Sequence, residues 1–96
     1  MPVLLIAYDL HKKPKEEYDE FHKIVKSYSY TTLSESSYAI NTTDTIKIVY
    51  DKLCPIVDDG DKFYIIALTN PHLGHGLTVT LEWLDKNLPS QDLWKS

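Results

Sequence analysis

The amino-acid sequence predicts an α+β fold in which helices pack on one antiparallel sheet. Two short runs, residues 3–8 and 63–68, are apolar on both alternating faces, as strands within a sheet often are. Between these runs, Tyr18, Phe21 and Val25 recur at helical spacing. A chain of 96 residues is long enough for one domain with a single hydrophobic core.

The first strand, residues 3–8, is followed directly by Asp9 and then by a polar loop. Pro14 indicates the first turn of a helix, because proline loses no helical hydrogen bond there. Glu16 and Glu17 lie in that turn, where negative charge is favourable to the helix dipole. The apolar stripe of this helix is Tyr18, Phe21, Ile24, Val25 and Tyr28.

Residues 30–41 are rich in Tyr, Thr and Ile and are interrupted by Ser34-Glu35-Ser36, which predicts two strands joined by a hairpin. A second helix follows, with caps from Thr42-Thr43-Asp44 and an end at Pro55. Its expected buried residues are Ile46, Val49 and Leu53. Residues 63–68 form the fourth strand, and a last helix is expected over 79–88.

The order strand, helix, strand, strand, helix, strand predicts a ferredoxin-like βαββαβ domain with an antiparallel sheet of order 4-1-3-2 and an added C-terminal helix. We expect one domain over residues 1–89 and a flexible tail over 90–96. The fourth strand, 63–68, would then be an edge strand without a polar face. Exposed apolar edges promote association. Either the last helix or a second copy of the chain must cover it, and we expect a homodimer through this edge.

The predicted topology gathers acidic residues at one end of the sheet, because the first strand ends where the hairpin turns and the fourth strand begins. The residues expected there are Asp9, His11, Glu35, Asp58, Asp59 and Asp61. Oxygen ligands of this kind suit Mg²⁺ or Mn²⁺. Asp58, Asp59 and Asp61 surround Gly60 in an ordinary turn composition, so solvated loop carboxylates are the alternative. Asp9 is the strongest candidate, because a buried strand fixes its position.

The charge balance weighs against tight binding to a nucleic-acid backbone. The net charge is −4, and all ten basic residues are lysines. Arginine is the usual bidentate ligand of phosphate, so its absence leaves at most weak nucleic-acid binding. Tyr30 and Tyr38 are the tyrosines expected to face outward, where bases could stack on them. An acidic surface also fits a basic protein partner.

No run of the sequence approaches the roughly 18 apolar residues of a membrane span, so we expect no membrane association. The single cysteine, Cys54, is expected to be reduced and buried. A free thiol without a disulfide partner is typical of a reducing compartment. We therefore expect a cytoplasmic protein.

The apolar strand ending in Tyr8-Asp9, the amphipathic helix, the hairpin LSESSYAI and the strand DKFYIIAL together resemble the CRISPR-associated protein 2 family. Its stand-alone relatives, VapD-type toxin ribonucleases and SinR-like small proteins, share the layout over roughly residues 2–69. The resemblance implies a ferredoxin-like homodimer in which Asp9 faces its dimer mate across a metal site. It also matches Ser36 or Ser37 to a serine of the family, and implies metal-dependent cleavage of RNA or DNA.

Two functions stay open at this point. One is a weak metal-dependent endonuclease of nucleic-acid-processing ancestry, with Asp9 as catalytic residue and metal ligand and with Mg²⁺ or Mn²⁺ as cofactor. The other is a non-catalytic dimeric binding module, a regulator or inhibitor that presents an acidic face to a basic protein. The acidic residues along the first helix, Glu16, Glu17, Asp19 and Glu20, favour the second.

Overall fold

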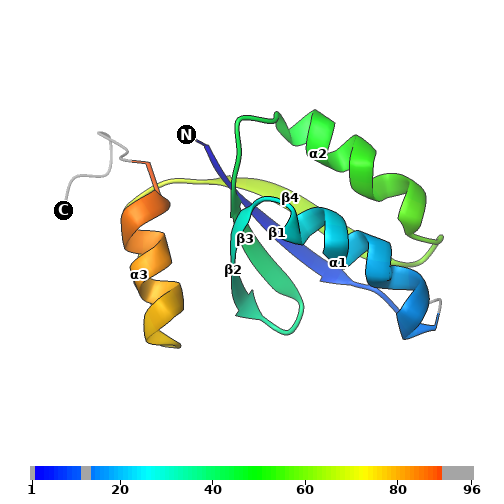
Figure 1. The fold of residues 1–96 in the computed structure, drawn as a ribbon, viewed down its shortest axis with the longest axis horizontal. Helices are drawn as coiled ribbons and strands as arrows, with labels where there is room; N and C mark the ends of the chain where they lie inside the picture. Colours follow the sequence, from blue (N-terminus) through cyan, green and yellow to red (C-terminus); the bar gives the residue numbers. More distant parts are fainter. Residues whose placement is uncertain (1, 12–13, 90–96) are drawn as a thin grey trace.

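The computed structural model describes residues 2–11 and 14–89, and the predicted tail over 90–96 lies outside the described residues. The chain forms an α+β fold with one four-stranded antiparallel sheet, which confirms the predicted class (Figure 1). The elements are β1 (Val3–Asp9), a 3₁₀ turn (Lys15–Tyr18), α1 (Asp19–Lys26), β2 (Ser29–Ser34), β3 (Ser37–Asn41), α2 (Ile46–Leu53), a 3₁₀ turn (Cys54–Ile56), β4 (Lys62–Leu68) and α3 (Thr78–Asn87).

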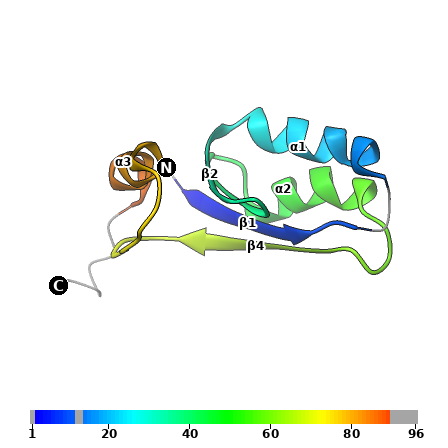
Figure 2. The same cartoon turned by 90° about the horizontal axis from the view of Figure 1, so that it is seen from below.

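The sheet order is β2-β3-β1-β4, which reads β4-β1-β3-β2 from the other edge. Every neighbouring pair is antiparallel, with β1 between β3 and β4. Helices α1 and α2 lie side by side on one face of the sheet, and α3 lies apart from them (Figures 1 and 2). Among the described elements, two helices thus cover one face of the sheet, and α3 alone approaches the second face.

The main core lies between the sheet and the two helices α1 and α2. Leu4, Ile6 and Ile40 from the sheet pack there against Phe21 and Val25 of α1. Alternation along β1 sends Val3 to the opposite face. There Val3, Ala39 and Leu88 form a second, smaller cluster with the partly buried Leu68, Trp83 and Leu84. The terminal helix thus covers one end of the second face.

Two details of α2 differ from the prediction. Ile46 was expected to be buried, and this expectation is wrong, because its side chain is 42% exposed. The helix begins one residue later than the proposed caps imply, with the side chain of Thr45 accepting a hydrogen bond from Ile48 N at 3.2 Å. Ile46 is therefore the first residue of the helix and lies on its outer side, whereas Val49 and Leu53 are buried as predicted.

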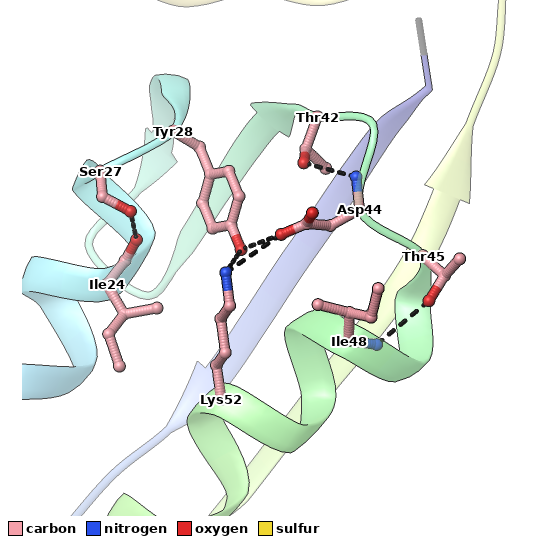
Figure 3. Close-up of polar contacts among 8 residues, drawn as sticks. All are labelled: Ile24, Ser27, Tyr28, Thr42, Asp44, Thr45, Ile48 and Lys52. Atoms are coloured by element: carbon pink, nitrogen blue, oxygen red, sulfur yellow. Dashed lines mark hydrogen bonds and ion pairs between the residues drawn. The ribbon is translucent and has the colours of Figure 1, made fainter.

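A polar clamp joins the end of α1 to α2 (Figure 3). The Tyr28 hydroxyl donates to Asp44 Oδ2 at 2.8 Å, and Lys52 Nζ donates to both groups, at 3.0 and 3.1 Å. Burial raises the pKa of Tyr28, which keeps its hydroxyl a donor. The hydrogen bonds from Tyr28 and Lys52 lower the pKa of the Asp44 carboxyl. The clamp therefore favours the ionised aspartate in the folded protein.

Asp44→Asn is expected to lower the free energy of unfolding near neutral pH. It should also make that free energy depend less on pH in the acidic range. Because the pKa of Asp44 is lowered on folding, its contribution is present above the unfolded pKa and is lost as the pH falls through the folded one. Urea unfolding between about pH 7 and pH 3 measures this effect. The control is Asp51→Asn, which removes an exposed partner of Lys47 on the same helix. Equal acid profiles for the two variants would contradict the clamp's role.

Candidate functional site at the end of the sheet

The carboxyl end of β1, the β2–β3 turn and the start of β4 meet at one end of the sheet. In the strand register, Ala7 lies opposite Ser37 of β3, and Asp9 lies opposite Lys62 of β4. The Tyr8 backbone N–H donates to Ser36 O at 2.9 Å, which ties the hairpin turn to β1. The juxtaposition of strand ends predicted from the topology is therefore present.

Asp9 is the last residue of β1, and its side chain is 67% exposed. Among the described residues, its polar partner is His11, whose Nδ1 lies 3.3 Å from Asp9 Oδ1. Because side chains alternate along a strand, Asp9 belongs to the same face as Leu5 and Ala7, away from α1 and α2. The carboxylate thus stands at the end of the sheet face that the two core helices leave open.

Asp61 has a different role from Asp9. Its Oδ1 accepts a hydrogen bond from His11 N at 2.9 Å, and its Oδ2 accepts from the Tyr18 hydroxyl and from Asp58 N. One carboxylate therefore connects the loop after β1, the turn before β4 and the 3₁₀ turn before α1. Both oxygens of Asp61 thus accept hydrogen bonds from the protein, so its role is to hold the segments of the rim together rather than to bind a ligand.

The remaining acidic candidates lie at the same end of the sheet but do not converge. Glu35, Asp58 and Asp59 are exposed on the hairpin turn and on the turn before β4. Within residues 2–11 and 14–89, no group of three or more His, Cys, Asp or Glu side chains is arranged to hold a metal ion. One copy of the chain brings together two donors, Asp9 and His11. The predicted gathering of six residues is thus a shared rim and not a single cluster.

Tyr38 was expected to face outward, and this expectation is wrong. Its side chain is 6% exposed and lies on the helix-covered face, because Tyr38 pairs with Ile6 in the β1–β3 register. Its ring stacks on Tyr8 at 5.8 Å between centroids. Tyr30 is exposed, as predicted, and the edge of its ring packs against that of Tyr38 at 5.9 Å between centroids. The two tyrosines form one packed pair and no stacking platform.

The aromatic cluster around Tyr8 also contains His22, which was not among the predicted site residues. The Tyr8 hydroxyl donates to Glu35 O at 3.0 Å, and His22 Nδ1 lies 3.2 Å from the Tyr38 hydroxyl. Burial raises the pKa of Tyr8 and lowers the pKa of His22. Both groups are therefore neutral near pH 7. The position of His22 beside Phe21 on the predicted helical stripe is the signal that could have placed it here.

The loop after β4 holds a second histidine arrangement at the opposite end of the sheet, where Leu68 pairs with Val3. His72 Nδ1 lies 2.6 Å from Asn70 Oδ1, and His72 Nε2 lies 3.1 Å from Asp85 Oδ1 of α3. Asn70 in turn donates from its side chain to Leu88 O at 3.0 Å. These contacts fasten the loop to α3. They do not belong to the rim around Asp9.

No family model, curated protein or solved structure matches this chain. Within the described part of the chain, no helix has the length and apolar character needed to span a membrane. The candidate site is therefore defined by its geometry: an exposed carboxylate and a neighbouring imidazole at the end of an open sheet face.

Proposed function

We propose that this chain is a ferredoxin-like homodimer of nucleic-acid-processing ancestry, in which the two Asp9 carboxylates bind Mg²⁺ or Mn²⁺ and support weak endonuclease activity. The observation that carries the proposal is the position of Asp9. It is an exposed carboxylate on a rigid strand, and its described polar partner is His11, whose side chain is also exposed. A carboxylate that the fold does not use for its own stability is available for binding.

A second copy of the chain completes the donor set. Magnesium is commonly held by one or two carboxylates, with the other positions taken by water and substrate phosphate oxygens. One copy supplies one such carboxylate, so a two-fold pairing that brings the Asp9 residues together would supply two. A bound divalent ion would contribute positive charge at a phosphodiester. His11, next to Asp9, would orient the carboxylate.

Strand β4, which begins at Lys62 opposite Asp9 in the strand register, offers the surface for this pairing. β4 is an edge strand, and its outward side chains Tyr64 and Ile66 are 59% and 51% exposed. In register they lie beside Ala7 and Leu5, on the face that also carries Asp9. An apolar strip of this kind is typical of association surfaces. We therefore place the dimer contact along β4.

Asp9→Ala is expected to abolish Mg²⁺ and Mn²⁺ binding measured by isothermal titration, while the wild type binds one ion per dimer. Asp59→Ala is the matched control and should retain binding, because Asp59 is an exposed rim carboxylate that lies outside strand β1. Circular dichroism checks that both variants fold. Metal binding justifies a cleavage assay on RNA and DNA.

Two results would overturn the metal proposal: no binding to the wild type, or equal binding to Asp9→Ala. Either one would favour the binding module instead, since Glu35, Asp58 and Asp59 then remain as an exposed acidic rim. A basic protein partner would associate with such a rim more slowly at high salt.

A further inference from the structure

A cavity of about 630 Å³ lies between α3, the loop 69–77 and the last residues of β2. Seven of its sixteen described lining residues are leucines, among them Leu68, Leu77, Leu81 and Leu84. The loop approaches the helix closely, since a Cβ added at Gly74 would lie 3.3 Å from Leu81 Cδ2. Leu68, Leu84 and Leu88 of the smaller cluster line the cavity, on the sheet face away from the main core. Leu68 and the loop lie at the sheet end opposite Asp9, whereas Leu33 and Ser34 lie toward the hairpin turn.

Three polar side chains that line the cavity, Ser34, His72 and Thr80, have polar partners within the protein. The Thr80 hydroxyl donates to Thr32 O at 3.1 Å and lies 3.3 Å from Thr31 Oγ1. Ser34 Oγ is 2.7 Å from Ser37 Oγ. Both ring nitrogens of His72 face Asn70 and Asp85. A ligand therefore gains little from polar groups directed at these three side chains, because each new hydrogen bond would replace an existing one.

The charges near the cavity also bear on the kind of ligand that it would bind. His72 and Asp85 face each other at 3.1 Å, so the imidazole already has a carboxylate partner. An anionic ligand at His72 would meet that carboxylate, and a cationic ligand would compete with the imidazole for it. Electrostatic complementarity thus favours a ligand without net charge.

We propose that this cavity is a binding site for a small, uncharged, largely hydrocarbon molecule. Its volume falls within the range of about 300–1,000 Å³ that is usual for small-molecule sites, and such sites are lined mainly by apolar side chains. Leu73 and Leu77 line the cavity and are strongly exposed, so a ligand would remove their apolar surface from water. The proposal is independent of Asp9 and of any metal.

The test is titration of the full-length protein with N-phenyl-1-naphthylamine, a neutral probe that fluoresces in apolar sites. We expect saturable binding of one probe per chain and at least tenfold weaker binding to Leu81→Phe, which fills the cavity. Val79→Phe is the control, because Val79 lies exposed on the same helix outside the cavity lining. Asp9→Ala should bind the probe like the wild type, which separates this proposal from the proposed function.

NMR of the methyl groups of the wild type provides a second test in case Leu81→Phe does not fold. With probe added to the wild type, the methyl groups of Leu81 and Leu84 should shift, whereas those of Val49 and Leu53 in the main core should not. Absence of saturable binding, or shifts confined to the main core, would overturn the proposal. Binding that appears only in a full-length Leu93→Ser/Trp94→Ser variant would also overturn the proposal. The chain's own terminal segment would then be the occupant of the cavity.

Discussion

Phe21→Ala is expected to lower the free energy of unfolding by about 3–5 kcal/mol, the usual cost of removing a buried phenylalanine ring. Phe21 is fully buried at the centre of the main core. Its ring contacts Tyr8 at 5.2 Å, His22 at 5.7 Å and Phe63 at 6.0 Å between centroids. These partners belong to β1, α1 and β4, so the ring joins three elements and its loss leaves a cavity among them.

Urea unfolding followed by circular dichroism measures this loss. Since a domain of this size has a total stability of about 5–15 kcal/mol, the variant should unfold at much lower denaturant. Ile46→Ala is the control: Ile46 is apolar and helical but 42% exposed, and its truncation should cost less than about 1 kcal/mol. Comparable losses for the two variants would contradict the prediction that Phe21 contributes far more than Ile46 to stability.

Ile66→Lys is expected to weaken the proposed dimer contact along β4 by at least about a hundredfold. In a two-fold dimer each substitution occurs twice at the interface. Removing two buried isoleucine side chains costs about 3 kcal/mol or more, and every 1.4 kcal/mol is roughly a factor of ten in affinity. The introduced ammonium groups add a further penalty, because they would be buried without partners. The protein should therefore sediment as a monomer where the wild type is a dimer.

Sedimentation equilibrium over a range of protein concentrations tests this prediction, with Val79→Lys as the matched control. Val79 is also exposed and apolar, but it lies on α3 and away from β4. A wild type that remains monomeric at roughly micromolar concentration and above would remove the basis for a shared Asp9 site. Loss of the dimer in Val79→Lys alone would move the interface to α3.

Much of the secondary structure follows from local patterns in the sequence. The apolar runs became β1 and β4, and the stripe containing Tyr18, Phe21 and Val25 became the buried side of the first helical segment. These signals are strong because apolar residues recur with the period of the helix or strand whenever one face of that element packs on the core. The meeting of the strand ends at Asp9 also followed, since it depends on the direction of each strand and not on side-chain packing.

Other features depend on which face of an element the tertiary packing covers. In a continuous apolar run, alternation does not distinguish the two faces, so β1 alone could not show that Tyr8 turns toward the helices and Asp9 away from them. Tyr38 is buried for the same reason: its register partner Ile6 lies under α1 and α2. Ile46 was predicted to be buried and is exposed. The residue at which a helix begins decides which side chains of its first turn face outward, and the sequence placed that residue too early.

By itself, the sequence determined the class of fold, the position of the helices and strands, and the acidic end of the sheet. Only the tertiary structure separated the carboxylates there into Asp61, which holds three segments together, and Asp9, which stays exposed. It alone revealed the leucine-lined cavity, whose walls come from β2, β4, a loop and α3. The physical reason is that hydrogen-bond partners and cavities depend on residues far apart in the chain, whereas helix and strand patterns depend on near neighbours.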